Sequence, residues 1–162
     1  MNGDLVKYFS HDHVFLRNTI ETDINALVSL INEAYSYQDK ARNSQRTNPI
    51  HLTKRISETD FYVVQNDDKI IGCVYLEPQG ESLHFGLLTV IPEFRGTGLG
   101  TVIMNAIVEL AEAGSYKYVD LDYMSVAPWL KKYYERYGFY ETSEKTEWGL
   151  IDLIRMRRKT VV

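Results

Sequence analysis

Apolar residues recur every three to four positions along three stretches of the chain, and this spacing predicts three main helices. The first covers residues 24–34 and the second covers 99–113, where Gly114 is suited to end it. The third covers 128–138 and begins with Pro128, a residue that helices tolerate in their first turn. The apolar face of the second helix comprises Leu99, Val102, Ile103, Ala106, Ile107 and Leu110.

Segments rich in β-branched and aromatic residues, bounded by turn residues, predict strands between these helices. The predicted strands are 13–19, 61–66, 69–77, 82–91, 116–124, 139–142 and 149–159. Residues 38–49 are polar and show no periodicity, and a short helix is predicted over 51–57. Three of the strands follow one another directly, which argues against a purely parallel sheet. The pattern therefore predicts an α/β fold, with a mixed, mostly antiparallel central sheet and helices on its faces.

Three glycines alternate with other residues where the strand 82–91 gives way to the second helix, in the sequence FRGTGLGT (94–101). Glycine allows a sharp turn and a close approach to backbone amides. The first amides of a helix have no internal acceptor and bind anions well. Arg95 adds a positive charge and Thr101 a hydroxyl, so the segment predicts a pyrophosphate site. A tight turn without a ligand is the alternative.

The order of residue types in this loop excludes two common phosphate-binding motifs. A P-loop requires lysine followed by serine or threonine after its last glycine, whereas Gly100 is followed directly by Thr101. The dinucleotide-binding fingerprint requires its third glycine one residue later than Gly100 and an early βαβ unit. The loop therefore predicts a third kind of phosphate-binding turn.

The composition and charge of the chain limit the kinds of partner and the cellular compartment that we expect. The chain has 162 residues, a size typical of one domain, and its net charge of −4 argues against nucleic acid as a partner. Its single cysteine, Cys73, excludes an internal disulfide and is expected to be a small buried residue. We find no signal-peptide pattern and no membrane-length apolar run. We expect a cytoplasmic protein without a membrane partner.

The HDH sequence (11–13) lacks further ligands, so no metal site is predicted.

The sequence VIPEFRGTGLG (90–100) resembles the acetyl-coenzyme A (acetyl-CoA) signature of the GNAT superfamily of N-acetyltransferases, through Arg95, Gly98 and Gly100. Downstream, YYERYGFYE (133–141) resembles the second family signature, a helix that carries tyrosine ahead of Gly-Phe. The predicted order of elements is similar to the family fold over nearly the whole chain. The resemblance implies a single GNAT domain over 1–162, with two splayed strands at the centre of its sheet.

The resemblance also implies the cofactor, acetyl-CoA, and the residues that bind it. The pantetheine arm would pair with the free edge of the strand that ends at Val90, where a backbone amide would face the developing oxyanion. The pyrophosphate would be held mainly by loop amides. The implied cofactor-binding residues are Leu88, Val90, Arg95, Gly96, Thr97, Gly98, Leu99, Gly100 and Thr101.

The implied reaction is direct attack of a primary amine on the thioester, through a tetrahedral intermediate. Tyr134 matches the general acid of the family, although core packing alone also explains a tyrosine there. An alkylamine must lose a proton first, at a cost of about 4–5 kcal/mol at pH 7. His84 and Glu77 are the candidate bases, with Asp122 as a further carboxylate. The alternatives are that Glu77 and Asp122 are solvated strand residues and that His84 is satisfied within the sheet. A catalytically inactive acyl-CoA-binding sensor of the same fold is the alternative function.

Two further features of the sequence concern contacts to the cofactor and to the amine acceptor. Many relatives carry asparagine seven residues before the tyrosine, where this chain has Ala127, so cofactor contacts from that junction are in doubt. The stretch 38–50 lies where the family builds its acceptor pocket, and Arg46 in it is a candidate for binding a carboxylate of the acceptor; a mobile solvated loop is the alternative. The expected partner is a small-molecule or peptide amine, and a homodimer is possible in this superfamily.

Overall fold

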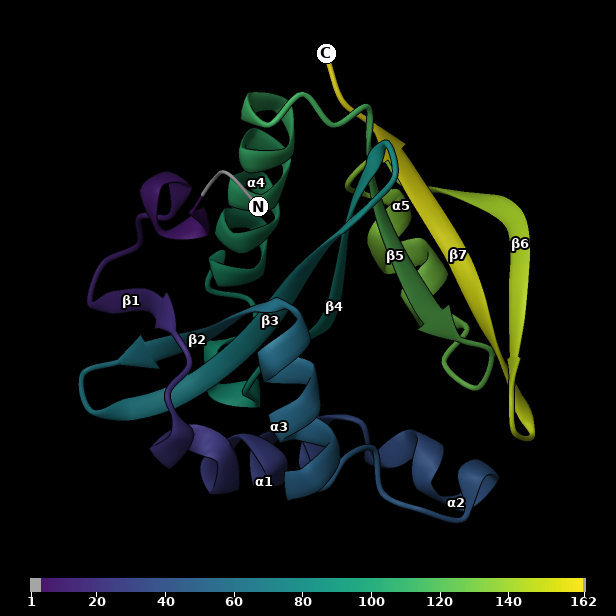
Figure 1. The fold of residues 1–162 in the computed structure, drawn as a ribbon, viewed down its shortest axis with the longest axis horizontal. Coiled ribbons are helices and arrows are strands. Elements are labelled where there is room, and N and C mark those ends of the chain that lie inside the picture. Colours follow the sequence, from purple (N-terminus) through teal and green to yellow (C-terminus); the bar gives the residue numbers. More distant parts are fainter. Residues whose placement is uncertain (1–3, 162) are drawn as a thin grey trace.

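A computed structural model describes residues 4–161 and contains a seven-stranded mixed sheet (Figure 1). The strands lie in the order β1-β2-β3-β4-β5-β7-β6, and every neighbouring pair is antiparallel except β4 and β5. This arrangement confirms the predicted fold class. The strands are β1 (Val14–Asn18), β2 (Asp60–Asn66), β3 (Lys69–Gln79), β4 (Ser82–Val90), β5 (Tyr118–Met124), β6 (Tyr140–Trp148) and β7 (Ile151–Lys159).

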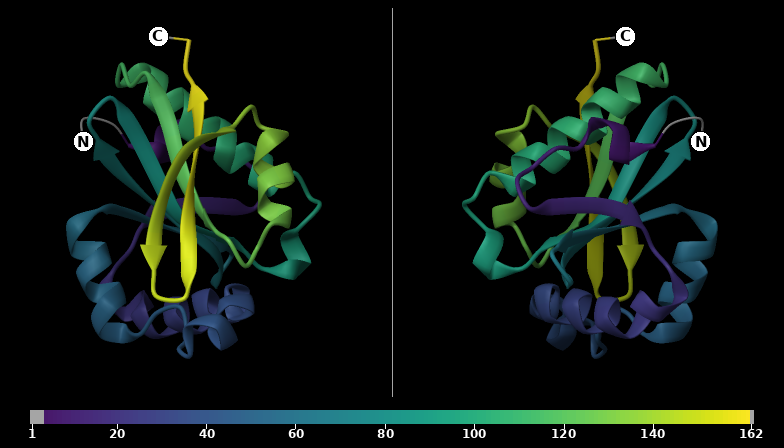
Figure 2. Two further views of the ribbon diagram at one scale, coloured as in Figure 1. Left: turned by 90° about the vertical axis from the view of Figure 1, so that its right-hand side faces the viewer. Right: turned by 90° about the vertical axis from the view of Figure 1, so that its left-hand side faces the viewer.

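Helices cover both faces of the sheet, so the structure has three layers (Figure 2). The helices α4 and α5 pack on one face, against a hydrophobic cluster to which every strand except β6 contributes. The helices α1 and α3 pack on the other face, against a smaller cluster on β2, β3 and β4. The helices are α1 (Ile24–Ala34), α2 (Asp39–Arg42), α3 (Pro49–Glu58), α4 (Leu99–Ala113) and α5 (Trp129–Glu135).

The two central strands separate after a short paired segment. β4 and β5 pair only over Ser82–His84 and Tyr118–Asp120, and then diverge toward the end of β4 (Figure 1). A bulge in β4 accompanies the divergence, because the pairing with β3 shifts there and Leu87 adopts a left-handed φ of 52°. The edge of β4 that faces β5 is consequently without a strand partner over its second half.

A buried carboxylate stands at the last pair before the strands separate. Asp120 is 1% exposed and accepts hydrogen bonds from Arg157 (Nε 2.8 Å, Nη2 3.0 Å) and from Arg155 (Nη1, 3.4 Å). Arg157 also donates to Ser82 Oγ on β4, at 3.3 Å. These bonds tie β4, β5 and β7 together at the point where the splay begins.

The structure departs from the sequence-based prediction in two places. Residues 38–50 are not a structureless loop: a 3-10 turn (Ser36–Gln38) leads into α2, and both are too short to produce a hydrophobic period. β6 extends to Trp148, well past the predicted end at residue 142. Its side chains are mostly exposed and give no hydrophobic pattern, so its second half is formed through its pairing with β7. Residues 1–3 of the segment considered as a signal peptide lie outside the described residues. Within 4–161 no helix has the length and apolar character that a membrane span requires.

Candidate active site

A cavity of about 660 Å³ lies where β4 and β5 separate. It connects the glycine loop and the start of α4 to the end of α1, with α5 as its other wall. The residues that line it are Ala34, Tyr35, Tyr37, Leu88, Thr89, Val90, Phe94, Arg95, Gly96, Gly98, Gly100, Thr101, Trp129, Leu130, Tyr133, Tyr134, Arg136 and Tyr137.

The glycine loop presents open backbone to this cavity. Gly96 and Gly98 have φ angles of 77° and 87°, a conformation that residues with a side chain rarely adopt. Apart from the glycine itself and its two chain neighbours, no described residue has an atom within 4 Å of a methyl group placed on either of them. The first intrahelical bond of α4 runs from the Val102 amide to the Gly98 carbonyl (3.0 Å), so the preceding amides of the helix have no intrahelical acceptor. The loop can therefore receive an anion.

Arg95 and Thr101 flank these amides. Arg95 is exposed, and its Nε donates a 3.1 Å hydrogen bond to the Val90 carbonyl. Its two terminal nitrogens have no hydrogen-bond partner within residues 4–161 and are available to a phosphate. The Thr101 hydroxyl lies 3.0 Å from that of Tyr137 on the opposite wall. Two residues predicted to bind the cofactor, Thr97 and Leu99, do not line the cavity. Leu99 is fully buried in the core, and the Thr97 hydroxyl donates to the Phe94 carbonyl at 2.6 Å.

The end of β4 forms the floor of the cavity. Leu88, Thr89 and Val90 line it, and β5 does not pair with this part of β4. The Leu88 carbonyl accepts a hydrogen bond from Tyr35 Oη (3.1 Å), and the Thr89 hydroxyl donates to the Leu87 carbonyl (3.0 Å) inside the bulge. An extended chain can add to such an unpaired edge by backbone hydrogen bonds.

Tyr134 lies in the same cavity, although most of its side chain is in the core. It is 8% exposed, and its ring packs against Phe85, Phe139 and Tyr133, with centroids 5.0–6.1 Å away. Burial, followed by the neighbouring tyrosines, raises the pKa of its hydroxyl well above 10. The hydroxyl is therefore protonated at neutral pH and can donate to a base formed in the cavity.

Several cavity residues were not found by sequence reasoning. Trp129, Tyr133 and Tyr137 lie on the third predicted helix but were not named as candidates. The i, i+4 spacing of Trp129 and Tyr133 was the available signal that they share a face. Tyr35 and Tyr37 follow α1 and carried no such signal. The Tyr37 ring meets Trp129 edge-on with centroids 5.4 Å apart, which joins the end of α1 to α5 across the cavity.

The two candidate bases, His84 and Glu77, are outside the cavity lining, in adjacent positions of β4 and β3. Both ring nitrogens of His84 are buried without a hydrogen bond among the described residues, although Nε2 lies 3.4 Å from Asp122 Oδ2. The Glu77 side chain is 33% exposed and lies 3.9 Å from Arg55. Of the two candidates, Glu77 is the one that solvent reaches.

Asp122 is held as a carboxylate by its neighbours. Burial raises its pKa, but the close approach of His84 Nε2 (3.4 Å from Oδ2) and a hydrogen bond from Arg155 (Nε, 2.7 Å) together outweigh burial and lower the pKa from 3.8 to about 2. A lowered pKa of an acid stabilises the folded protein above its ordinary pKa and ceases to do so as pH falls through the lowered one. Asp122 thus connects β5 to β7 and to His84 on β4.

Replacing Asp122 by asparagine should consequently lower the free energy of unfolding at neutral pH, on the order of 2 kcal/mol. The difference from the wild type should shrink as pH falls from about 4 to about 2. Urea unfolding at several pH values measures it. An unchanged free energy at pH 7, or a difference that persists at pH 2, would contradict the assignment.

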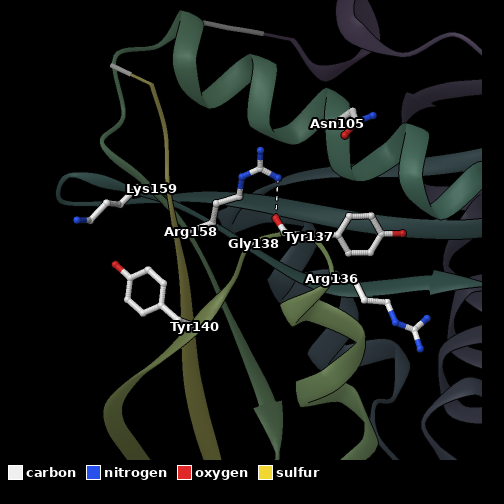
Figure 3. Close-up of a pocket in the computed structure, with 7 residues that line it drawn as sticks. All are labelled: Asn105, Arg136, Tyr137, Gly138, Tyr140, Arg158 and Lys159. Carbon is white, nitrogen blue, oxygen red and sulfur yellow. Dashed lines mark hydrogen bonds between the residues drawn. The ribbon is translucent and has the colours of Figure 1, made fainter.

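A second, shallow pocket of about 590 Å³ adjoins the first and shares Arg136 and Tyr137 with it (Figure 3). Arg158 on β7 donates from Nη1 to the Tyr137 carbonyl at 2.7 Å, and Lys159 lies beside it. Asn105, Gly138 and Tyr140 complete the lining. Three cationic side chains give this pocket a positive character, although the chain as a whole is acidic.

The remaining candidates are apart from the cavity. Ala127, which stands where many relatives carry asparagine, is fully buried at the junction of β5 and α5 and does not line the cavity. Its methyl side chain offers no hydrogen bond to a cofactor. Cys73 is buried, and its thiol donates to the Leu87 carbonyl (3.3 Å); burial raises its pKa to about 12. In the part of the chain that the structure describes, no three histidine, cysteine, aspartate or glutamate side chains gather as metal ligands would.

Comparison with known proteins identifies the family. Residues 31–160 match the model of the acetyltransferase (GNAT) domain. The chain is 26% identical over 144 residues to an uncharacterized N-acetyltransferase of Methanocaldococcus jannaschii; the match covers 82% of this chain and 63% of that relative.

Solved structures share the fold at lower identity. Ard1 from Thermoplasma volcanium has a TM-score of 0.73 and 16% identity, over 93% of this chain and 99% of the other. PaiA N-acetyltransferase from Thermoplasma acidophilum, solved in complex with coenzyme A, has a TM-score of 0.71 and 15% identity, over 90% and 98%. The domain match covers most of the sequence, and the fold agrees with it: this chain belongs to the GNAT acetyltransferase family.

Proposed function

We propose that the protein transfers the acetyl group of acetyl-CoA to a primary amine by direct attack of the amine on the thioester. One observation supports this most strongly: a single cavity joins the glycine loop, the unpaired edge of β4 and the buried Tyr134 hydroxyl. Each of these three parts meets a separate requirement of acyl transfer, namely a held diphosphate, a positioned thioester and a proton for the leaving thiolate.

The residues present suit acetyl-CoA. The open amides of the loop and the terminal nitrogens of Arg95 match a diphosphate, and the unpaired edge of β4 matches the amide-containing pantetheine arm. When bound, acetyl-CoA supplies an activated acetyl group. The basic second pocket continues the first at Arg136 and Tyr137 and suits the remaining phosphate of the coenzyme.

Proton transfers are divided between the two sides of the splay. Tyr134, fully protonated at neutral pH, donates to the sulfur that leaves. On the side of α1 and α3, Glu77 and His84 are adjacent across β3 and β4, and Glu77 reaches solvent, so a water between Glu77 and the amine provides a path for the amine proton. Backbone amides at the end of β4 face the position where negative charge develops.

The alternative is a module that binds acyl-CoA without turnover. A panel of amines assayed for free thiol release, beside calorimetric binding of CoA, separates the two. Thiol release that depends on an amine supports the transferase. Tight CoA binding without release for any amine class would support the sensor and contradict our proposal.

Replacing Arg95 by alanine should weaken CoA binding roughly tenfold or more, because a charged hydrogen-bond donor to phosphate is lost. Isothermal titration calorimetry measures the dissociation constant. Lys69→Ala, at an exposed position of the β2–β3 turn, is the control for the loss of one positive charge. Equal affinity of the Arg95 variant and the wild type would remove this residue from the phosphate site.

A further inference from the structure

Three arginines gather on the side of the splay that faces α1, α2 and the β6–β7 hairpin. Arg42 Cζ lies 3.3 Å from the centre of the Trp148 ring, and Arg46 Cζ lies 4.8 Å from the same centre. Arg46 Cζ is also 5.7 Å from the centre of Tyr35, and Arg55 Cζ is 4.7 Å from that of Tyr75. We call these residues the arginine–aromatic cluster: Arg42, Arg46, Arg55, Tyr35, Tyr75 and Trp148.

The cluster has more positive charge than its surroundings neutralise. Within residues 4–161, the only carboxylate within 4 Å of a cluster guanidinium is that of Glu77, 3.9 Å from Arg55. Neither Arg42 nor Arg46 forms an ion pair or a side-chain hydrogen bond there, and Arg46 Nε is shielded from solvent without a partner. Burial lowers the pKa of Arg46, and the charges of Arg55 and Arg42 lower it further, against the effect of Tyr35 and Tyr75. Arg46 is partly buried, and a partly buried charge without a partner is costly, so a bound anion would reduce that cost.

The segment that carries Arg46 is held in place. Asn32 of α1 makes two hydrogen bonds to the next residue, from Nδ2 to the Thr47 carbonyl (3.1 Å) and from the Thr47 amide to Oδ1 (2.8 Å). Gln38 Nε2 donates to the Ser44 carbonyl at 2.9 Å. These bonds are buried or partly buried, so the guanidinium is positioned before a ligand arrives. The structure thus favours an organised acceptor pocket over a mobile loop.

Tyr35 connects the cluster to the reaction cavity. It lines the cavity and donates its hydroxyl to the Leu88 carbonyl, while its ring lies beside the Arg46 guanidinium. Trp148 and Arg42 close the opposite side, where α2 meets the tip of the β6–β7 hairpin (Figures 1 and 2). An anion bound at Arg46 is therefore separated from the cavity by one aromatic side chain, and from the glycine loop by the cavity itself.

We propose that the amine acceptor carries a carboxylate and that Arg46, assisted by Arg42, binds it between Tyr35 and Trp148. This proposal rests on the transferase function proposed above. A guanidinium matches a carboxylate with two parallel hydrogen bonds, so the cluster selects an amino acid or a peptide with a free carboxylate near its amine over an uncharged amine.

The first experiment measures acceptor preference. Thiol release from acetyl-CoA is followed with amino acids and with their α-carboxamides, and kcat/KM is expressed per concentration of neutral amine because amidation lowers the amine pKa. The wild type should prefer the carboxylate about tenfold or more. Arg46→Gln should abolish that preference mainly through KM, Arg46→Lys should keep part of it, and Lys40→Gln, an exposed position of α2, should keep all of it. Equal use of acids and amides, or a preference retained by Arg46→Gln, would overturn the proposal.

The second experiment needs no turnover. The chain has two tryptophans, so in a Trp129→Phe background Trp148 is the single fluorescent reporter. N-acetyl amino acids should change its emission saturably, whereas their amides should not, and adding Arg46→Gln should remove the response. The absence of an Arg46-dependent response to any of these carboxylates would overturn the anion site even in an active enzyme. Such a response without thiol release for any amine would instead overturn the transferase function and the acceptor role.

Discussion

Replacing Tyr134 by phenylalanine should lower kcat by about a hundredfold or more while leaving the dissociation constant of CoA within a few-fold of the wild type. The expected loss follows from removing a general acid. The ring of Tyr134 packs against Phe85 and Phe139, and phenylalanine preserves that packing. The hydroxyl itself has no hydrogen bond to another described side chain, so its removal leaves no partner unsatisfied.

The measurement is steady-state thiol release at saturating acetyl-CoA, with calorimetry for CoA binding and a thermal melt to check folding. Tyr62→Phe is the control for the loss of a buried tyrosine hydroxyl, because Tyr62 lies in the same hydrophobic cluster but on β2, outside the cavity. The Tyr62 hydroxyl accepts a 3.3 Å hydrogen bond from the Leu5 amide, so this control should cost at least as much stability as Tyr134→Phe. The raised pKa of Tyr134 adds a second expectation: its deprotonation should not reduce kcat below pH 10. An unchanged kcat in Tyr134→Phe would remove this residue from the mechanism.

Replacing Asp120 by alanine should cost about 3–5 kcal/mol of the free energy of unfolding, the range for removing one partner of a buried ion pair. Asp120 is 1% exposed, and among the described residues its loss leaves the Arg157 guanidinium with one hydrogen-bond acceptor, the Ser82 hydroxyl, beside the Tyr118 ring that it faces at 4.2 Å. The loss should also weaken CoA binding, because Asp120 stands in the last β4–β5 pair before the splay and fixes where the cavity begins.

Urea unfolding followed by circular dichroism measures the stability, and calorimetry measures the affinity of the folded variant. Glu58→Gln is the control, since the Lys54–Glu58 pair is exposed on α3 and should contribute little. If Asp120→Ala unfolds at nearly the urea concentration of the wild type, the buried pairs do not hold the splay together. A less severe variant, Asp120→Asn, should show an intermediate loss.

Much of this fold could be predicted from local pattern. The helix at 99–113 was predicted with the bounds that the structure has, because its apolar period and Gly114 act within a few residues. The same holds for the glycine loop. The left-handed φ of Gly96 and Gly98 is a requirement of the backbone itself, and such requirements are visible in the residue type. α2 and the second half of β6 escaped prediction because neighbours, not periodicity, stabilise them.

The candidate site residues show the same contrast between what a local motif indicates and what tertiary packing decides. Tyr134 and the loop glycines lie in motifs, and the structure places them in one cavity. The resemblance also implied cofactor contacts at Thr97 and Leu99, which do not line that cavity; contacts through their backbone amides stay a prediction. The Leu99 side chain is directed into the core by the orientation of α4, which the residue types of the motif do not indicate.

By itself, the sequence determined most of the helices and strands, that a glycine-rich turn joins β4 to α4, and that a tyrosine-rich helix precedes the final strands. These properties depend on backbone preference and on periodicity over a few residues. Only the tertiary structure decided where β4 leaves β5, that His84 is enclosed away from the cavity, and that Arg42 and Arg46 meet Trp148. Those outcomes depend on packing between residues that are far apart in the chain, and no local pattern records which distant side chains a folded backbone brings together.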